Sequence, residues 1–234
     1  CGLAVLVETA RMWRSLGHHD RYGAWRIDGV TGPDEYTAVV RDNVFTNLMA
    51  AANLRVAADA CARHPDAAAE LGVGNEETAT WRDAADAVHI PYDPDLGVHP
   101  QCEGFTTLRE WDFTDNTKYP LLLHEPYVRL YPAQVIKQAD LVLAMQWQSH
   151  AFTAEQKARN VDYYERRTTR DSSLSACTQA VMCAEVGHLE LAHDYTYEAA
   201  LIDLRDLHHN TGDGLHLASL AGTWTALVAG FGGL

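Results

Sequence analysis

Helical periodicity dominates this chain and limits the folds that it can adopt. Apolar residues recur three and four positions apart along most of the sequence, whereas the two-residue alternation of strands is scarce. The helical pattern covers residues 3–16, 39–60, 75–88, 132–148, 153–164, 174–186, 189–195, 197–205 and 215–231. Many helices joined by long loops favour an all-α protein built from antiparallel helix pairs.

Two of these segments carry helix start signals. Thr153 and Gln156 have the spacing of a capping box, in which each side chain bonds the backbone N–H of the other residue. Asn75 stands before Glu76 and Glu77, and acidic residues in a first turn complement the helix dipole. We therefore expect Thr153 and Asn75 to be N-caps.

The helical pattern breaks between residues 90 and 126. Prolines, glycines and several aromatic residues fall in this stretch. An irregular segment of this length within a compact domain is usually functional. Nothing in the sequence resembles a linker, a low-complexity tract or a short-period repeat, so residues 1–234 are expected to lie in one domain.

The charge balance excludes several classes of partner. Lys and Arg number 18 against 32 Asp and Glu, a formal charge of −14. Nucleic acid and anionic membrane surfaces both require a positive footprint, so neither is an expected partner. No apolar run approaches the length of a membrane span, and no signal peptide opens the chain.

The five cysteines are Cys1, Cys61, Cys102, Cys177 and Cys183, an odd number without a C-x-x-C pair. They are typical of reduced, mostly buried thiols in a cytoplasmic protein. The twelve histidines form neither an H-E-x-x-H motif nor a Cys/His cluster with zinc-site spacing. No structural metal is therefore expected.

The segment from Asp28 to Tyr36, Asp-Gly-Val-Thr-Gly-Pro-Asp-Glu-Tyr, carries the first candidate site residues. It places Asp34 and Glu35 in a Gly/Pro-punctuated loop just before a helical pattern. A partly desolvated carboxyl group in such a loop suits a general acid. The alternative is a solvated turn, because Gly-Pro-Asp is ordinary turn chemistry.

Lys137 and Gln138 form the second candidate group. A cation beside a two-sided amide can bind several sugar hydroxyls. The alternative is a solvated helix face, since adjacent helical residues do not share a face.

Two helix starts are candidate anion sites. In Arg-Asp-Ser-Ser-Leu-Ser, residues 170–175, hydroxyls and free backbone N–H groups meet. Plain N-capping by Ser172 or Ser173 is the alternative. His216, in Gly-Leu-His-Leu-Ala-Ser (214–219), could contact phosphate or be a hydrogen-bonded core residue.

These blocks together resemble glycoside hydrolase family 65, which includes the maltose, trehalose and kojibiose phosphorylases. Residues 28–36 are similar to the family's catalytic-acid motif, and residues 121–146 to its Lys-Gln helix. Residues 170–175 and 213–219 match two later blocks in the same order. The resemblance implies the later part of an (α/α)6-barrel catalytic domain. The family's N-terminal β-sandwich, the first half of the barrel and the C-terminal β-sheet domain have no counterpart in residues 1–234.

The resemblance also implies roles for individual residues. Glu35 would be the general acid, and Lys137 and Gln138 would bind the transferred glucose. The expected phosphate ligands are Ser172, Ser173, His216 and Ser219. Phosphate would then attack the anomeric carbon of an α-glucoside and give β-glucose 1-phosphate with inversion.

Inorganic phosphate would be a co-substrate, so no cofactor is expected. The expected partners are a disaccharide or oligosaccharide and phosphate, and relatives commonly form homodimers. Hydrolysis in the same family is the runner-up activity. Two other classes of protein fit the sequence less well. A non-catalytic carbohydrate-binding relative would not need Glu35 or Ser172. An acidic helical scaffold would show an exposed apolar stripe or a repeat, and neither is evident.

Glu103 has two possible roles. Its carboxylate either contacts a sugar hydroxyl or caps a turn.

Overall fold

The computed structural model describes residues 2–114 and 118–234, and most of their length is helical. The helices are α1 (Gly2–Leu16), α2 (Val44–Arg63), α3 (Pro65–Glu70), α4 (Asn75–Asp86), α5 (Tyr127–Leu130), α6 (Asp140–Trp147), α7 (Ala154–Glu165), α8 (Ser175–Glu185), α9 (Leu189–Leu201) and α10 (Leu217–Thr225), which a π-helical stretch (Ala226–Phe231) continues. The strands are β1 (Gly17–His19) and β2 (Trp25–Ile27), an antiparallel pair, and β3 (Arg109–Glu110) and β4 (Ala133–Gln134), a parallel pair. The predicted all-α class is confirmed.

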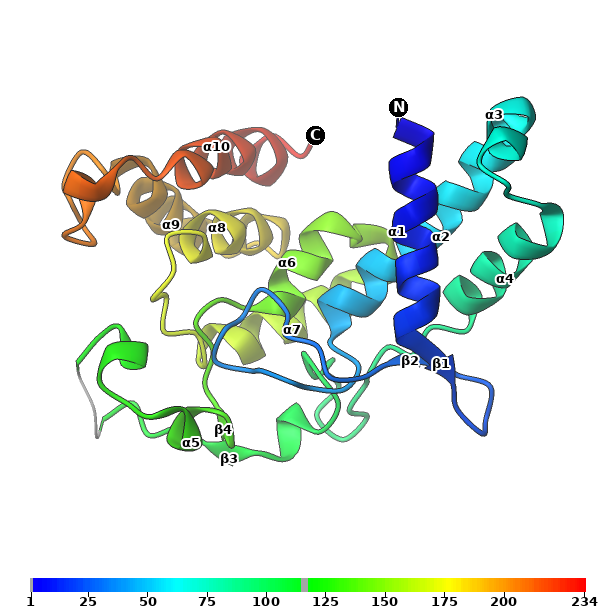
Figure 1. The fold of residues 1–234 in the computed structure, drawn as a ribbon. Coiled ribbons are helices and arrows are strands. Elements are labelled where there is room, and N and C mark those ends of the chain that lie inside the picture. Colours follow the sequence, from blue (N-terminus) through cyan, green and yellow to red (C-terminus); the bar gives the residue numbers. More distant parts are fainter. Residues whose placement is uncertain (1, 115–117) are drawn as a thin grey trace.

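The helices form two groups joined by α6. Figure 1 shows α1, α2 and α4 on one side and α8, α9 and α10 on the other, and α6 contacts both α2 and α8. One core, which includes Trp25, Leu54 and Trp81, holds the first group together. A second core runs from α2 through α6, α7, α8 and α9. β3, β4 and α5 lie below the helices in Figure 1, among the long loops.

The start of α2 shows why the pattern over residues 39–60 overestimated the helix. Val39 and Asp42 have φ values of 55° and 50°, which a right-handed helix does not allow. The helix begins only at Val44, where the Asn43 side chain caps it by accepting a hydrogen bond from the Thr46 N–H at 3.0 Å. The preceding residues are thereby free to form a structured loop.

The predicted helix over residues 132–148 is wrong in its first half. Ala133 and Gln134 form β4, and Ile136 makes a bridge by exchanging hydrogen bonds with the Arg167 carbonyl and the Thr169 N–H at 2.9 and 2.8 Å. Lys137 and Gln138 lie in a bend, and helix α6 starts only at Asp140. The solvated helix face proposed as the alternative for Lys137 and Gln138 therefore does not exist.

Other boundaries differ in smaller ways. The capping box of Thr153 and Gln156 is confirmed, but the N-cap position of α4 is Gly74 and not Asn75. The patterns over 189–195 and 197–205 form one helix, α9, which already ends at Leu201, and the sequence pattern missed α3. Residues 90–126 are irregular as predicted in their described part, with two 3-10 turns and β3.

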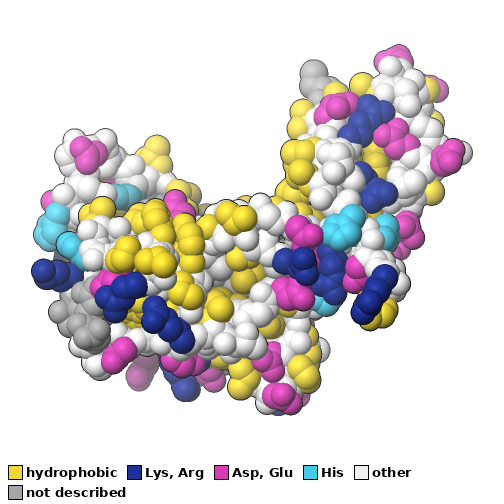
Figure 2. Space-filling model, turned by 60° about the horizontal axis from the view of Figure 1, so that its bottom comes forward, with side chains coloured by type: hydrophobic (Ala, Val, Ile, Leu, Met, Phe, Trp, Pro, Cys, Tyr) yellow, Lys and Arg dark blue, Asp and Glu magenta, His cyan; other side chains and the backbone are white. Residues whose placement is uncertain are grey.

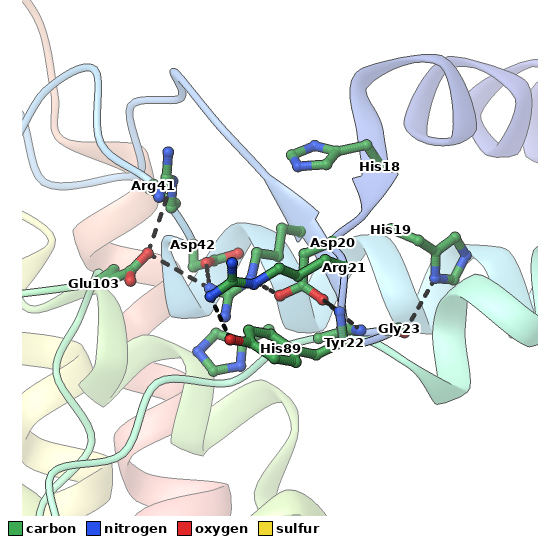
Figure 3. Close-up of polar contacts among 12 residues, drawn as sticks. His18, His19, Asp20, Arg21, Tyr22, Gly23, Arg41, Asp42, His89 and Glu103 are labelled. Carbon is green, nitrogen blue, oxygen red and sulfur yellow. Dashed lines mark hydrogen bonds and ion pairs between the residues drawn. The ribbon is translucent and has the colours of Figure 1, made fainter.

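An ion-pair network anchors the β1–β2 hairpin to the start of α2. The Arg26 guanidinium lies 2.7 Å from the Asp20 carboxylate, 2.6 Å from that of Asp42 and 3.5 Å from that of Glu103. Figure 3 labels Asp20, Asp42 and Glu103 and marks the contacts of this network with dashed lines. The hydrogen bond from Arg26 holds the pKa of Asp20 below its usual value. Glu103 also approaches Arg41 at 3.7 Å, so its carboxylate belongs to this network.

The surface in Figure 2 has acidic and basic side chains interspersed, without a continuous basic area among the described atoms of that face. Within residues 2–114 and 118–234, no helix is long and apolar enough to cross a membrane. The same residues contain no group of three His, Cys, Asp or Glu side chains that could hold a metal ion.

Cys61, Cys102, Cys177 and Cys183 are free and buried, and Cys1 lies outside the described residues. Burial raises the pKa of Cys102 and Cys183 to about 12. Because the thiolate is the reactive form, we expect iodoacetamide at neutral pH to label Cys102 and Cys183 only after denaturation. Peptide mass spectrometry measures this, and rapid labelling of either residue in the folded protein would contradict the buried placement.

Candidate active site

Three segments that are distant in sequence meet at the candidate site. They are the loop between β2 and α2 (28–43), the segment before α6 (133–139) and the turn before α8 (170–174). The hydrogen bonds between them are made largely by residues of the sequence blocks described above.

Asp34 joins the first two segments. Its side chain is fully buried, and its Oδ1 accepts hydrogen bonds from the backbone N–H groups of Tyr36 at 3.1 Å and Lys137 at 2.8 Å. Its Oδ2 accepts from the Thr37 hydroxyl at 2.7 Å and from Gln101 Nε2 at 2.9 Å. Burial raises the pKa of Asp34, and these four donors act in the opposite direction. Asp34 thus fixes the shape of the loop that carries Glu35.

Asp140, the first residue of α6, supports Asp34 from behind. One of its oxygens accepts the backbone N–H of Asp34, and the other accepts Asn43 Nδ2 at 2.6 Å. Burial and the nearby charge of Asp34 raise the pKa of Asp140 well above its usual value. The cap of α2 and the start of α6 are thus fastened to the loop that carries Glu35.

Glu35 and Lys137 form an ion pair through Glu35 Oε2 and Lys137 Nζ. The Glu35 side chain is 57% exposed and that of Lys137 is 20% exposed. The partial desolvation expected for Glu35 is therefore not a feature of residues 1–234 by themselves. The structure does bring the predicted acid and the predicted sugar-binding cation into contact.

Gln138 and Ser172 form a second pairing. The Ser172 hydroxyl donates to Gln138 Oε1 at 2.6 Å, and Gln138 Nε2 donates to the Pro33 carbonyl at 2.6 Å. The side chain of Ser172 does not cap α8: the N-cap position is Leu174, which makes no side-chain cap bond. Ser173 is partly exposed beside Ser172. The candidate residues of the three sequence blocks, Glu35, Lys137–Gln138 and Ser172, are thus neighbours in the folded chain.

Tyr36 and Asp171 are site residues that the sequence reasoning missed. The Tyr36 hydroxyl donates to Asp171 Oδ2, which also accepts the Leu121 N–H at 2.9 Å. Burial and the Asp171 carboxylate raise the pKa of Tyr36. Both residues stand inside the quoted sequence blocks, next to residues that were chosen, and an aromatic hydroxyl beside an acidic pair was the available signal.

His216 and Ser219, the other two expected phosphate ligands, form hydrogen bonds with residues outside the three segments of the candidate site. His216 Nδ1 lies 2.6 Å from Asp203 Oδ1, and the His216 N–H donates to Asp203 Oδ2 at 2.8 Å. Ser219 is fully buried, and its hydroxyl donates to the Ala199 carbonyl at 3.4 Å. Among the described residues, neither contacts Ser172 through a hydrogen bond or ion pair. Asp203 was missed because nothing in its sequence neighbourhood marks it.

A groove of about 430 Å³ opens beside the site, between α6, α8 and α10. Gln138 and Ser175 are among its lining residues, and Val142, Trp147 and Gly222 contribute apolar walls. Trp147 itself is largely exposed. The groove therefore presents an uncovered apolar surface next to the predicted sugar-binding residues.

Gly32 is required where the loop passes Asp140 and Asn43. A Cβ at this position would lie 2.2 Å from Asp140 Oδ2 and 2.5 Å from Asn43 Nδ2. We expect Gly32→Ala to destabilise the full-length protein by about 1–3 kcal/mol, as overpacking in a filled site does. Urea unfolding measures this. Gly212→Ala is the control, because nothing lies within 4 Å of a Cβ there, and equal effects of the two changes would contradict the packing.

The glycosyl hydrolase family 65 central catalytic domain matches residues 1–225, and the chain belongs to this family. The predicted family is thereby confirmed.

Three relatives place the chain more closely. It is 84% identical over 234 residues to an uncharacterized glycosyl hydrolase of Mycobacterium tuberculosis, covering all of this chain and 30% of that protein. It is 46% identical to an alpha,alpha-trehalose phosphorylase of Geobacillus stearothermophilus, again covering all of this chain and 32% of that enzyme. A solved structure, a putative kojibiose phosphorylase from human microbiome, superposes with a TM-score of 0.90 at 30% identity and covers all of this chain and 36% of its own. The chain thus spans about a third of the length of these relatives.

Proposed function

We propose that the full-length protein containing this chain is an inverting disaccharide phosphorylase. It would convert an α-glucoside and phosphate into β-glucose 1-phosphate and a free sugar. The observation that carries the proposal is the contact of Glu35 with Lys137 and of Gln138 with Ser172 at one place in the fold. The similarity to a trehalose phosphorylase supports it.

The proposed chemistry is one displacement. A protonated Glu35 donates its proton to the glycosidic oxygen, a phosphate oxygen attacks the anomeric carbon from the opposite face, and the bond to the leaving sugar breaks. An inverting hydrolase needs a second carboxylate, roughly 6.5–9.5 Å from the acid, to activate water. A phosphorylase needs donors that position an anion instead. Ser172 and Ser173 supply hydroxyl groups for this role, and His216 would join them if phosphate bridges the two elements.

The Glu35–Lys137 ion pair has a consequence for this mechanism. Glu35 must carry a proton to act as an acid, while Lys137 occupies one of its oxygens. Substrate binding therefore has to draw Lys137 from Glu35 to the hydroxyl groups of the glucose. The exposure of both side chains leaves room for this movement.

We also propose that the apolar groove is covered by the rest of the same catalytic domain, the first half of the barrel. Its walls are exposed in this chain, and the relatives are about three times longer. Covering the groove would desolvate the neighbouring site and complete the sugar-binding surface.

We further propose that the full-length protein forms a homodimer and that it is cytoplasmic. The free thiols support the cytoplasmic location.

The test uses the full-length protein with trehalose, maltose and kojibiose, each with and without phosphate. The proposal predicts that cleavage of the preferred sugar depends on phosphate and that one glucose 1-phosphate forms per sugar released. Glucose release at the same rate without phosphate would overturn it in favour of hydrolysis.

A further inference from the structure

Asp34 stands beside the predicted acid in sequence, yet its carboxylate is turned inward and cannot contact a ligand. It is fully buried, whereas the neighbouring Glu35 side chain is 57% exposed. Its two carboxylate oxygens accept four hydrogen bonds, all from groups of the protein itself. The positions of these four donors indicate the role of Asp34.

Two of the donors are backbone N–H groups on opposite sides of the site. Tyr36 N–H fixes the residue after Glu35, and Lys137 N–H fixes the residue that carries the opposing cation. One carboxylate oxygen, Oδ1, accepts both bonds. A single atom therefore ties the main chain beside Glu35 to the main chain of Lys137.

The outer contacts hold this atom in place. Asp140 accepts the backbone N–H of Asp34, and Thr37 and Gln101 bond its second carboxylate oxygen. Gln138 Nε2 adds a further link to the carbonyl of Pro33, the residue before Asp34. A continuous set of hydrogen bonds thus runs from Asp140 at the start of α6, through Asp34, to Gln101.

We propose that Asp34 is a positioning residue, which aligns the acid Glu35 with Lys137 through its shared Oδ1; this rests on the proposed acid role of Glu35. A misplaced general acid fails most where the leaving group needs a proton. A leaving group that departs without one is affected much less. The ratio of the two rates separates alignment of the acid from general support of the fold.

The experiment compares Asp34→Asn with the wild type in the full-length protein, using the preferred disaccharide and α-glucosyl fluoride. A neutral Asn oxygen accepts the two backbone N–H groups more weakly than a carboxylate oxygen does, so the alignment of the two segments is loosened. Gln101 Oε1, which has no hydrogen-bond partner among the described residues, can turn to accept the new amide, and the variant is therefore expected to fold. We expect kcat for the disaccharide to fall by at least about tenfold, and kcat for the fluoride to fall by less than about threefold.

Asp42→Asn is the matched control, since Asp42 is equally buried but contacts Arg26 instead of the site. It should lower stability and leave the ratio of the two rates unchanged. If Asp34→Asn does not fold, Thr37→Val removes one donor to Asp34 and should shift the ratio in the same direction by a smaller factor.

Equal losses on both substrates, or a shift of the ratio in Asp42→Asn as large as in Asp34→Asn, would overturn the proposal. The reactions are run with whichever nucleophile the enzyme uses. A failed phosphorylase assignment then appears as phosphate-independent turnover of the wild type, and a failed positioning role appears as an unchanged ratio in Asp34→Asn.

Discussion

Replacing Glu35 by Gln in the full-length protein is expected to lower disaccharide turnover by roughly 10²–10⁴-fold, the usual contribution of a positioned general acid. The amide keeps the shape of the side chain but has no acidic proton to give to the glycosidic oxygen. Its oxygen can still accept a hydrogen bond from Lys137, so the contact between the two segments is retained. Steady-state kinetics and a thermal unfolding curve measure both effects.

The control for this substitution is Glu110→Gln. Glu110 is also an exposed glutamate, and its carboxylate forms an ion pair with Arg167. It is not one of the proposed active-site residues. We expect nearly wild-type turnover from it. A Glu35→Gln enzyme that folds normally and keeps more than about a tenth of the activity would reject Glu35 as the acid.

Replacing Arg26 by Ala is expected to have the largest effect on stability, about 3–5 kcal/mol, as when one partner of a buried ion pair is removed. Asp42 is fully buried and would lose its guanidinium partner, keeping among the described residues the Ile27 and Asn47 donors at 3.4 and 3.1 Å. The loss falls on the β1–β2 hairpin and the start of α2, which this ion pair joins. The free energy of unfolding in urea measures the loss.

Arg41→Ala provides the comparison. Its side chain is 58% exposed and pairs with Asp28 at 2.7 Å, so its loss should cost about 1 kcal/mol or less. An Arg26→Ala protein no less stable than Arg41→Ala would show that the buried pair does not anchor the hairpin.

Local signals in the sequence predicted much of the fold. The all-α class, the capping box at Thr153 and the irregular segment after residue 90 depend on side-chain spacing and capping chemistry, which act over a few residues. The helix expected over 132–148 failed because long-range bonds decide the conformation of its first half. Ile136 bonds to the 167–169 segment and Lys137 to Asp34, which single-sequence periodicity does not contain.

The site was predictable where its chemistry lies on reactive side chains that are at least partly exposed. Glu35, Lys137, Gln138 and Ser172 were chosen on residue type and resemblance, and the structure brings them into contact. Asp140 was not chosen, because a buried carboxylate at a helix start looks in sequence like an ordinary first-turn acid. Its function depends on which backbone group it meets, and that information exists only in the folded chain.

The most direct measurement is proton NMR of the reaction of the full-length protein with its preferred α-glucoside in phosphate buffer. The proposed inverting phosphorolysis predicts that β-glucose 1-phosphate appears first, in equal amount to the released sugar. Appearance of free glucose in place of the sugar phosphate, or of the α-anomer of the phosphate as the first product, would contradict it.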